Sequence, residues 1–371
     1  MNKFQPLMWV VLTIFSVILV VPSLLVVSFS NNPKQASTKQ NIVASTDIKE
    51  SKIDKNSTDP SLDVSVYRTN TKEIENIPLE EYVVGVVASE MPVTFELEAL
   101  KAQSLAARTF LVKQMLSNSK INLPDGTDIT DNIQYHQVYK NKKELANEWG
   151  ENYKSNISKI QKAVEATKGQ ILTYDEKPID ASFFSTSNGY TENSEDYWGN
   201  KTPYLKSVES PWDIQSPKFQ YQTTIQITKF EDLLGIKLNN DINIGRVISK
   251  SKGNRIKFFE INGKKYSGKT IRDKLKLNSS DFTFKREGNK VIIITKGNGH
   301  GVGMSQYGAN GLAQEGKNYK DIVNYYYQDV TISSVDPFIN KMYVKGKKYT
   351  STKRCTTTIR ELLRQLFFLW N

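Results

Sequence analysis

The feature that most restricts how this chain folds is an uncharged apolar run near its N-terminus, between Pro6 and Phe29. The run is long enough to cross a bilayer, which takes a helix of about 20 residues. Lys3 precedes it, so the positive-inside rule predicts a cytoplasmic N-terminus with the rest of the chain outside the cytoplasm. The competing interpretation is a cleaved signal peptide, which has a shorter apolar region and a small-residue cleavage site. This run is longer and no such site follows it, so we expect an uncleaved anchor.

The overall charge and the scarcity of metal ligands narrow the possible partners. The formal net charge is +11, which favours anionic partners such as nucleic acid, acidic lipid or an anionic cell wall. An extracytoplasmic location argues against nucleic acid and favours the wall. Cys355 is the only cysteine, and His136 and His300 are the only histidines. A structural Cys/His zinc site cannot be assembled from these residues, so we predict no metal and no cofactor.

A single carboxylate stands at a predicted helix end. Valines at positions 83, 84, 86 and 87 form an apolar surface, and Glu90 follows them directly before Met91-Pro92. Proline disfavours a helical conformation at Met91, so the helix should end there. The negative helix end and the apolar neighbours both favour a protonated Glu90, as a general acid requires. The same stretch is also compatible with an ordinary surface glutamate before a turn.

A second predicted helix, from Leu97 to Met115, follows this turn. Lys101 and Arg108 are seven residues apart and therefore share one stripe of the helix. Two cations on one stripe are candidates to contact acidic or polar groups of a substrate. The alternative is a solvated helix edge.

Two later segments also carry candidate residues. Ser185–Trp198 is a polar loop after a predicted strand, and its hydroxyls, acids and aromatic rings are suited to binding sugars. The glycine-rich segment 297–309 follows another predicted strand. It lacks the Gly-Lys-Ser/Thr ending of a nucleotide-binding loop, so its glycines are better explained by close approach of the backbone to a ligand or helix. Taken alone, His300 in this segment is as consistent with a buried structural histidine.

The patterns elsewhere predict mixed secondary structure. We expect paired strands at 170–174 and 179–184, a strand at 221–227, a hairpin about Asn262-Gly263 and a helix at 319–328. The polar segment 127–156 gives no clear assignment.

Three of these segments, in this order, resemble the stage II sporulation protein D family. They are Glu90-Met91-Pro92 with Leu97–Gln103 and Ala106–Phe110, the loop Ser185–Trp198, and the run His300–Gly308. The resemblance covers roughly residues 77 to 332. It implies a membrane-anchored lytic transglycosylase of the sporulation septum in the mother-cell membrane, with Glu90 as the catalytic acid. It also implies substrate-binding roles for a larger set: Lys101, Arg108, Ser185, Thr191, Tyr204, Lys206, His300, Gln306 and Tyr307.

The resemblance further implies what the protein acts with. The substrate would be peptide-stripped glycan strands of peptidoglycan, cleaved during engulfment. The partners would be the sporulation amidase designated P and the membrane protein designated M of the same stage. Some relatives carry a zinc-binding loop, for which this chain lacks the cysteines.

The expected organisation is an α+β fold, with helices and antiparallel strands around one catalytic groove behind an N-terminal transmembrane helix. The expected parts are a cytoplasmic N-terminus (1–6), the transmembrane helix (7–29), a flexible linker (30–63), the first part of the core (64–218), an inserted α+β subdomain (219–290), the second part of the core (291–335) and a C-terminal tail (336–371).

Two rival functions stay open, the first from the residues and the second from the resemblance, since some relatives of that family are described as amidase enhancers. A hydrolase using two carboxylates would take Glu192, Glu195 or Asp196 as the second acid. A non-catalytic wall-binding protein that enhances a partner amidase would be indifferent to Glu90.

Overall fold

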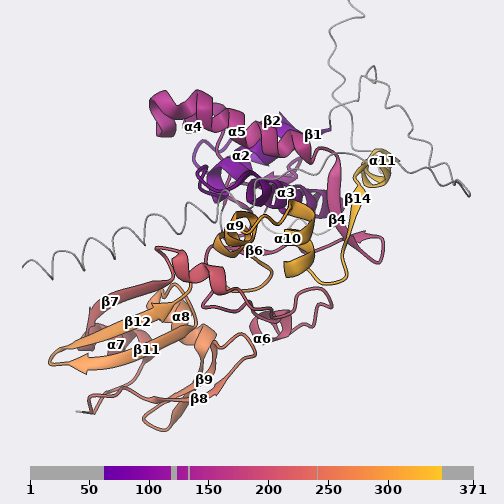
Figure 1. Cartoon of the computed structure of the whole chain (residues 1–371). Helices are drawn as coiled ribbons and strands as arrows, with labels where there is room; N and C mark the ends of the chain where they lie inside the picture. The colour runs from indigo at the N-terminus through magenta and orange to yellow at the C-terminus, as the bar shows by residue number, and fades with distance from the viewer. Residues whose placement is uncertain (1–61, 118–122, 133, 240, 345–371) are drawn as a thin grey trace, which may run out of the picture. The chain divides into compact units, whose positions relative to one another are not determined.

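The computed structural model describes residues 62–117, 123–132, 134–239 and 241–344, and it confirms mixed helices and mainly antiparallel strands (Figure 1). The predicted transmembrane helix, nearly all of the expected linker and the end of the C-terminal tail lie outside these residues. No helix within them is both long and apolar enough to cross a bilayer.

The helices are α2 (Leu79–Glu90), α3 (Leu97–Leu116), α4 (Lys142–Trp149), α5 (Tyr153–Ala166), α6 (Ser194–Trp198), α7 (Ile227–Leu234), α8 (Gly268–Leu275), α9 (Gln306–Gln314), α10 (Tyr319–Tyr326) and α11 (Asp336–Val344). The strands are β1 (Asp63–Tyr67), β2 (Ile74–Pro78), β3 (Ile129–Thr130), β4 (Gln170–Tyr174), β5 (Lys177–Pro178), β6 (Phe183–Phe184), β7 (Gln220–Gln226), β8 (Arg246–Lys250), β9 (Ile256–Ile261), β10 (Lys264–Ser267), β11 (Asp281–Glu287), β12 (Lys290–Lys296), β13 (Met304–Ser305) and β14 (Thr331–Ser334).

The helix α3 lies at the centre of the core. It contacts α2, α5, α9, α10, α11 and β4, and Figure 1 shows it surrounded by these helices. Its alanines, at positions 99, 102, 106 and 107, are fully buried. Small side chains let neighbouring helices approach closely, which explains how one helix can be covered on nearly every side.

The predicted break between α2 and α3 is confirmed. Pro78 directly precedes α2, Glu80 and Glu81 occupy its first turn, and acidic side chains stabilise that end of a helix. Met91 is extended, with φ −116° and ψ 139°, as expected for a residue before proline. The helix therefore ends with Glu90 as its last residue.

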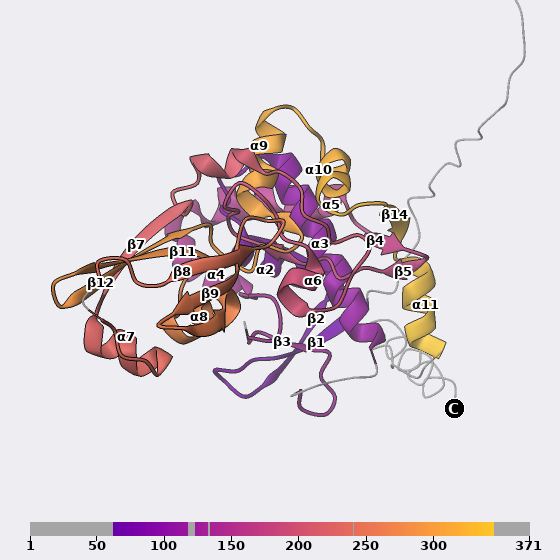
Figure 2. The same cartoon turned by 90° about the horizontal axis from the view of Figure 1, so that it is seen from below.

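The inserted subdomain has a hydrophobic core of its own. Its buried side chains run from Ile227 to Ile293 and include Phe230, Phe259 and Phe282. They pack between α7, α8 and two antiparallel sheets, ordered β11-β12-β7 and β10-β9-β8, and both views show α8 close to β9 (Figure 1, Figure 2). The expected hairpin is present, with positive φ at Asn262 and Gly263. Because β12 belongs to this sheet, the subdomain extends to Lys296 and not only to residue 290.

The two parts of the core meet on either side of this insertion. Strand β6 pairs in parallel with β13, so Phe183 lies beside Met304 and Phe184 beside Ser305. The sequence-based pairing of 179–184 with 170–174 was therefore wrong in part: β4 pairs with the two-residue strand β5 and with β14. The core also continues past residue 335, because Phe338 and Met342 in α11 are buried in it.

Candidate functional site

Glu90 is partly buried at the C-terminal end of α2. The backbone N–H of Val138 donates a hydrogen bond of 2.8 Å to its Oε1. Burial raises the pKa of this carboxyl, and the hydrogen bond from Val138 and the nearby amide of Gln306 limit the rise. The Gln306 Nε2 itself is buried without a partner of good hydrogen-bond geometry among the described residues. The carboxyl is thus held closer to protonation at neutral pH than an exposed glutamate.

The pairing of β6 with β13 brings the second and third sequence motifs to Glu90. Ser305 caps α9, which begins with Gln306 and Tyr307. The N–H of Tyr307 donates to the carbonyl of Ser185 at 3.1 Å. The Tyr307 ring packs edge-on against Phe95, with centroids 4.9 Å apart, just after the Met91-Pro92 turn. Ser185, Gln306 and Tyr307 are therefore gathered near the end of α2, as candidates for contact with a ligand there.

A buried aspartate holds this junction together. Asp213 is fully buried and accepts hydrogen bonds from the hydroxyls of Ser187, Ser210 and Ser305 at 2.6–2.8 Å. Burial raises the pKa of Asp213, and these bonds limit the rise. Asp213 was not among the site residues predicted from the sequence, although it directly follows Trp212. The Val138 N–H at Glu90 could not have been found, because a backbone donor has no sequence signature.

His300 lies beside the aromatic end of the Ser185–Trp198 loop. Its ring centroid is 5.5 Å from that of Trp198, and 5.7 Å from those of Tyr197 and Phe184. Its Nδ1 accepts a hydrogen bond from the Val302 N–H at 3.0 Å. Burial, with the nearby Arg272 and Arg255, lowers the pKa of His300 to about 3. The imidazole is therefore neutral at physiological pH, and it has no contact with Glu90.

Arg108 is placed differently from the expectation of a substrate-facing stripe. Its side chain is 0% exposed and forms an ion pair with Glu80, with Nη2 and Oε2 2.6 Å apart. Its Nη1 and Nη2 also donate to the carbonyls of Gln170 and Val164, at 3.1 and 3.3 Å. Because these bonds and the surrounding helices enclose the guanidinium, it is not exposed at the surface and acts as an internal link between α2, α3 and α5.

Lys101 is nearer the surface than Arg108. It pairs with Glu98, 2.5 Å away, and lies over the ring of Tyr319. The pair with Glu98 lies within α3, whereas the contact with Tyr319 joins α3 to the start of α10. No contact between Lys101 and Glu90 is found among the described residues.

Three further candidates serve mainly to hold the loop. Thr191 is fully buried, where its hydroxyl accepts from the Val208 N–H and donates to the Lys206 carbonyl. Tyr204 is 8% exposed, and its hydroxyl accepts from the Asp180 N–H. The side chain of Lys206 is 22% exposed and pairs with Glu195 at 3.0 Å. Thr191 and Tyr204 are therefore structural here, and Lys206 alone of the three presents a charge near the surface.

The three candidate second acids are engaged away from Glu90. Glu192 is 3% exposed and accepts a 2.6 Å hydrogen bond from Ser251. Burial raises the pKa of Glu192, and the nearby positive charge of Arg255 limits the rise. Burial alone would raise the pKa values of Glu195 and Asp196. Hydrogen bonds, including those from Lys206 and Lys257, outweigh it and leave both values lowered. No described Asp or Glu side chain hydrogen-bonds to Glu90 or shifts its pKa.

Arg255, which was also not predicted from the sequence, joins the inserted subdomain to the Ser185–Trp198 loop and to the glycine-rich segment 297–309. It is 3% exposed, and its Nη1 donates to the carbonyl of Tyr190 at 3.0 Å. Gly301 has φ of +89°, and a Cβ at that position would collide with the Arg255 guanidinium. The backbone conformation therefore favours a glycine there, and any side chain would also displace the buried Arg255 guanidinium.

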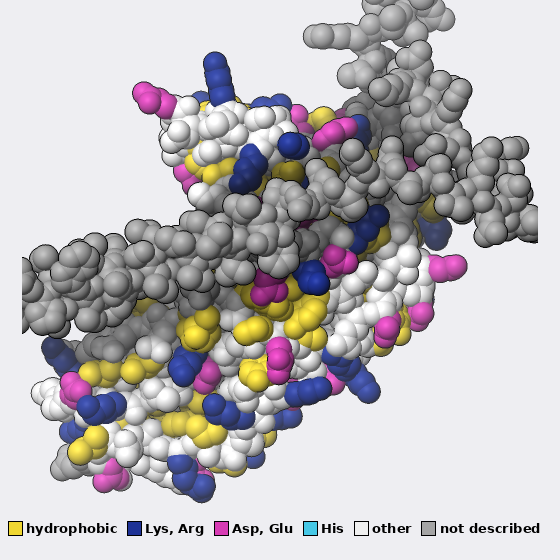
Figure 3. Space-filling model, viewed as in Figure 1, with side chains coloured by type: hydrophobic (Ala, Val, Ile, Leu, Met, Phe, Trp, Pro, Cys, Tyr) yellow, Lys and Arg dark blue, Asp and Glu magenta, His cyan; other side chains and the backbone are white. Residues whose placement is uncertain are grey.

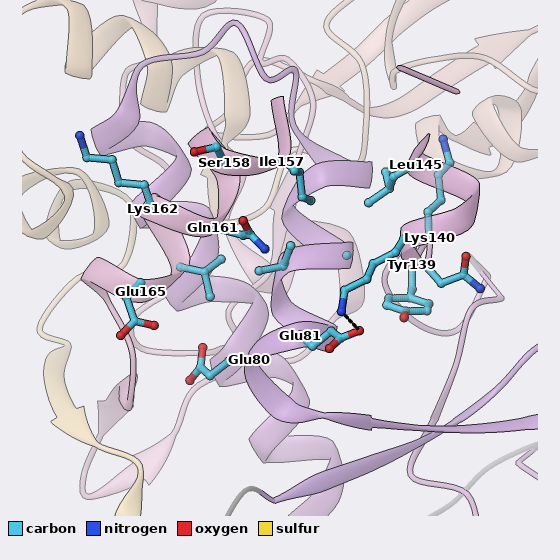
Figure 4. A pocket seen from close by; sticks show the side chains of 15 residues that line it. Glu80, Glu81, Tyr139, Lys140, Leu145, Ile157, Ser158, Gln161, Lys162 and Glu165 are labelled. Atoms are coloured by element: carbon cyan, nitrogen blue, oxygen red, sulfur yellow. Dashed lines mark ion pairs between the residues drawn. The ribbon is translucent and has the colours of Figure 1, made fainter. Parts of the chain in front are cut away.

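A cavity of about 480 Å³ lies between α2, α4 and α5 (Figure 4). Glu80, Tyr139 and Gln161 are among its lining residues, and Lys142 pairs with Glu81 at 2.8 Å beside it. Glu90 does not line it, so this cavity is separate from the candidate acid. Within the described part of the chain, no group of three or more His, Cys, Asp or Glu side chains is arranged to hold a metal ion; the expectation of a metal-free protein stays a prediction.

Comparison with known proteins defines the class to which this fold and site belong. A family model described as "Stage II sporulation protein" matches residues 67–174, which include Glu90 and α3. The chain is 49% identical over 331 residues to stage II sporulation protein D of Bacillus subtilis (strain 168), covering 89% of this chain and 96% of that protein. It is 48% identical to the protein of the same name from Bacillus amyloliquefaciens, covering 92% of this chain and 99% of that one.

The chain therefore belongs to the stage II sporulation protein D family, as its three motifs predicted. It is also 31% identical to a B. subtilis protein named "Amidase enhancer", over 67% of this chain and 40% of that protein.

Proposed function

We propose that this protein is a lytic transglycosylase that cleaves the β-1,4 bond between N-acetylmuramic acid and N-acetylglucosamine without water. The observation that carries the proposal is Glu90, a carboxyl with a raised pKa and no second carboxylate acting on it among the described residues. Glycosidases that use water rely on two carboxyl groups, one on either side of the bond. A single carboxyl acting first as an acid and then as a base fits an intramolecular reaction.

In the proposed reaction, protonated Glu90 donates its proton to the glycosidic oxygen as the bond from the anomeric carbon to that oxygen breaks. The resulting carboxylate takes the proton of the muramyl 6-hydroxyl, whose oxygen bonds to the anomeric carbon. The products are a free 4-hydroxyl on the departing sugar and a 1,6-anhydro ring on the muramic acid. Glu90 ends protonated, ready for another cycle.

The neighbours of Glu90 support each half of this cycle. The Val138 N–H stabilises the carboxylate once it forms, while burial favours its return to the protonated state. Gln306 and Tyr307 lie where they can position a bound sugar, and Ser185 adjoins them. Arg108 contributes by fixing α2, through Glu80, and thereby the position of Glu90.

The proposal extends to location and partners. The apolar run 7–29 would anchor the protein in the mother-cell membrane at the sporulation septum, with the described domain on the extracytoplasmic side. There it would act on peptide-stripped glycan strands during engulfment, beside the amidase designated P and the membrane protein designated M of the same stage. A relative named "Amidase enhancer" supports a link with an amidase.

That relative also supports a second candidate function, a wall-binding protein that enhances an amidase without cleaving glycan itself. The test uses the full chain in detergent micelles, incubated with purified glycan strands with and without stem peptides, and mass spectrometry of the products. We expect anhydro-muramyl ends that vanish with Glu90→Gln. Reducing ends would indicate hydrolysis, and binding without cleavage would favour the enhancer.

A further inference from the structure

Three aromatic rings form a small platform where the Ser185–Trp198 loop meets the third motif. Tyr197, Trp198 and His300 lie with each pair of ring centroids 5.5–5.7 Å apart. Trp198 is 44% exposed, whereas Trp149 and Trp212, the other described tryptophans, are less exposed. An exposed indole that is braced by two rings presents a rigid apolar surface, which is a common feature of binding sites.

The inserted subdomain adds positive charge to this platform. Lys269 in α8 lies with its Nζ 5.2 Å from the centre of the Tyr197 ring, and the Nη1 of Arg272 donates to the Tyr197 hydroxyl at 3.0 Å. Lys269 is exposed and pairs with no described carboxylate. Figure 3 shows Lys and Arg side chains spread over the face that this subdomain contributes. Its residues 219–290 hold 16 Lys and Arg against 7 Asp and Glu, so they carry much of the chain's excess positive charge.

The platform is connected to Glu90 through a short series of direct contacts. His300 packs on Phe184 in β6. Strand β6 pairs with β13, and the next residue after β13 is Gln306, whose amide approaches the Glu90 carboxyl. The rings therefore border the same junction as the candidate acid.

The proposed substrate has the matching chemistry. Removing the stem peptide from a muramic acid residue frees the carboxylate of its lactyl group, which is otherwise an uncharged amide. A stripped strand thus offers apolar pyranose faces and a negative charge on every second sugar. Aromatic rings stack on such faces, and exposed cations attract such charges.

We propose that Trp198 stacks on a sugar of the strand while Lys269 and Arg272 pair with a free lactyl carboxylate, so that this platform selects stripped glycan. The inference rests on the proposed function and names the residues responsible for its substrate preference. Lys269 is the better test of the charge, because Arg272 also donates to the Leu277 carbonyl and supports the subdomain.

The experiment measures binding in the full chain in detergent, with Glu90→Gln present so that no strand is cleaved. The probes are stripped glycan strands and the same strands with their carboxyl groups converted to methylamides. We expect tighter binding of the stripped strands, with a preference that decreases with salt. Lys269→Gln should reduce that preference about two- to fivefold, the range for an exposed ion pair. Trp198→Ala should weaken binding of both probes by up to about tenfold.

Matched controls are available on the same subdomain. Lys264 is an exposed lysine that lies over Tyr266, and Tyr221 is 55% exposed on β7. Lys264→Gln and Tyr221→Ala should leave both affinities unchanged. An unchanged preference in Lys269→Gln, or an equal loss in Lys264→Gln, would overturn the proposal.

Cleavage by the same variants with Glu90 intact separates this inference from the proposed function. If the parent protein makes anhydro ends but Lys269→Gln keeps the parent's ratio of kcat/KM between stripped and amidated strands, the platform assignment fails and the transglycosylase stands. If the parent cleaves neither probe but its preference in binding depends on Lys269, the platform stands and the transglycosylase fails.

Discussion

Replacing Arg108 by Met separates a structural role from a role in substrate binding. The guanidinium is fully buried and pairs with Glu80, which is 27% exposed, while it also bonds the carbonyls of Val164 and Gln170. Arg108→Met keeps much of the side-chain length but leaves these acceptors without their donor. Removing one partner of a buried pair costs about 3–5 kcal/mol. Because Glu80 keeps access to water, we expect the lower end, about 3 kcal/mol.

The assay is urea unfolding at pH 7, monitored by tryptophan fluorescence. With a slope of about 3 kcal/mol per molar urea, the expected loss lowers the midpoint by about 1 M. Lys113→Met is the matched control, because Lys113 lies on the same helix and pairs with Asp180 at 2.6 Å, but both side chains are substantially exposed. It should change stability by about 1 kcal/mol or less. An Arg108→Met protein with an unchanged urea midpoint and no glycan cleavage would refute the structural role. That result would instead support direct binding of Arg108 to the substrate.

Three other outcomes follow from the site. Burial raises the pKa of Glu90, so the stability that protonation provides is present at low pH and is lost as pH rises through the folded-state pKa. Glu90→Gln should therefore match the parent's stability near pH 4 and exceed it at pH 8 in urea unfolding; a less stable variant at pH 8 would contradict this. Gly301→Ala should destabilise the protein, because its Cβ collides with the buried Arg255 and its φ is positive, and thermal melting would show a lower Tm than for Gly316→Ala, whose positive-φ position is open. His300 should stay neutral between about pH 5 and 8, since its pKa is lowered to about 3, and an imidazole titration by NMR within that range would disprove it.

Local rules were sufficient for the parts of the fold that depend on neighbouring residues. Pro92 fixed the end of α2 and thereby the position of Glu90. The Asn262-Gly263 pair predicted the β9–β10 hairpin, because two residues with positive φ suit a tight turn. Both features are decided within a few residues, where steric preferences are strong.

Long-range features were not accessible in the same way. The seven-residue spacing of Lys101 and Arg108 correctly placed them on one stripe of α3, but spacing does not reveal which neighbours cover that stripe. Arg108 is enclosed by α2 and α5, while Lys101 stays near the surface. The approach of Gln306 to Glu90 depends on the β6–β13 pairing between distant segments. The resemblance to a family selected Gln306 and Tyr307 as site residues. The sequence pattern alone did not indicate that they lie near Glu90.

The closure of the chain around the inserted subdomain also affects when the site can form during synthesis. The N–H of Gly297 donates to the carbonyl of Phe219 at 2.7 Å, so the two ends of the insertion adjoin. Once that subdomain has folded on its own hydrophobic core, it brings β6 and β13 together at little further cost in loop entropy. Glu90 is synthesised well before Gln306. A chain that has been synthesised only as far as the insertion therefore lacks a complete site, and the Glu90 carboxyl gains its neighbour Gln306 only after the insertion has been made.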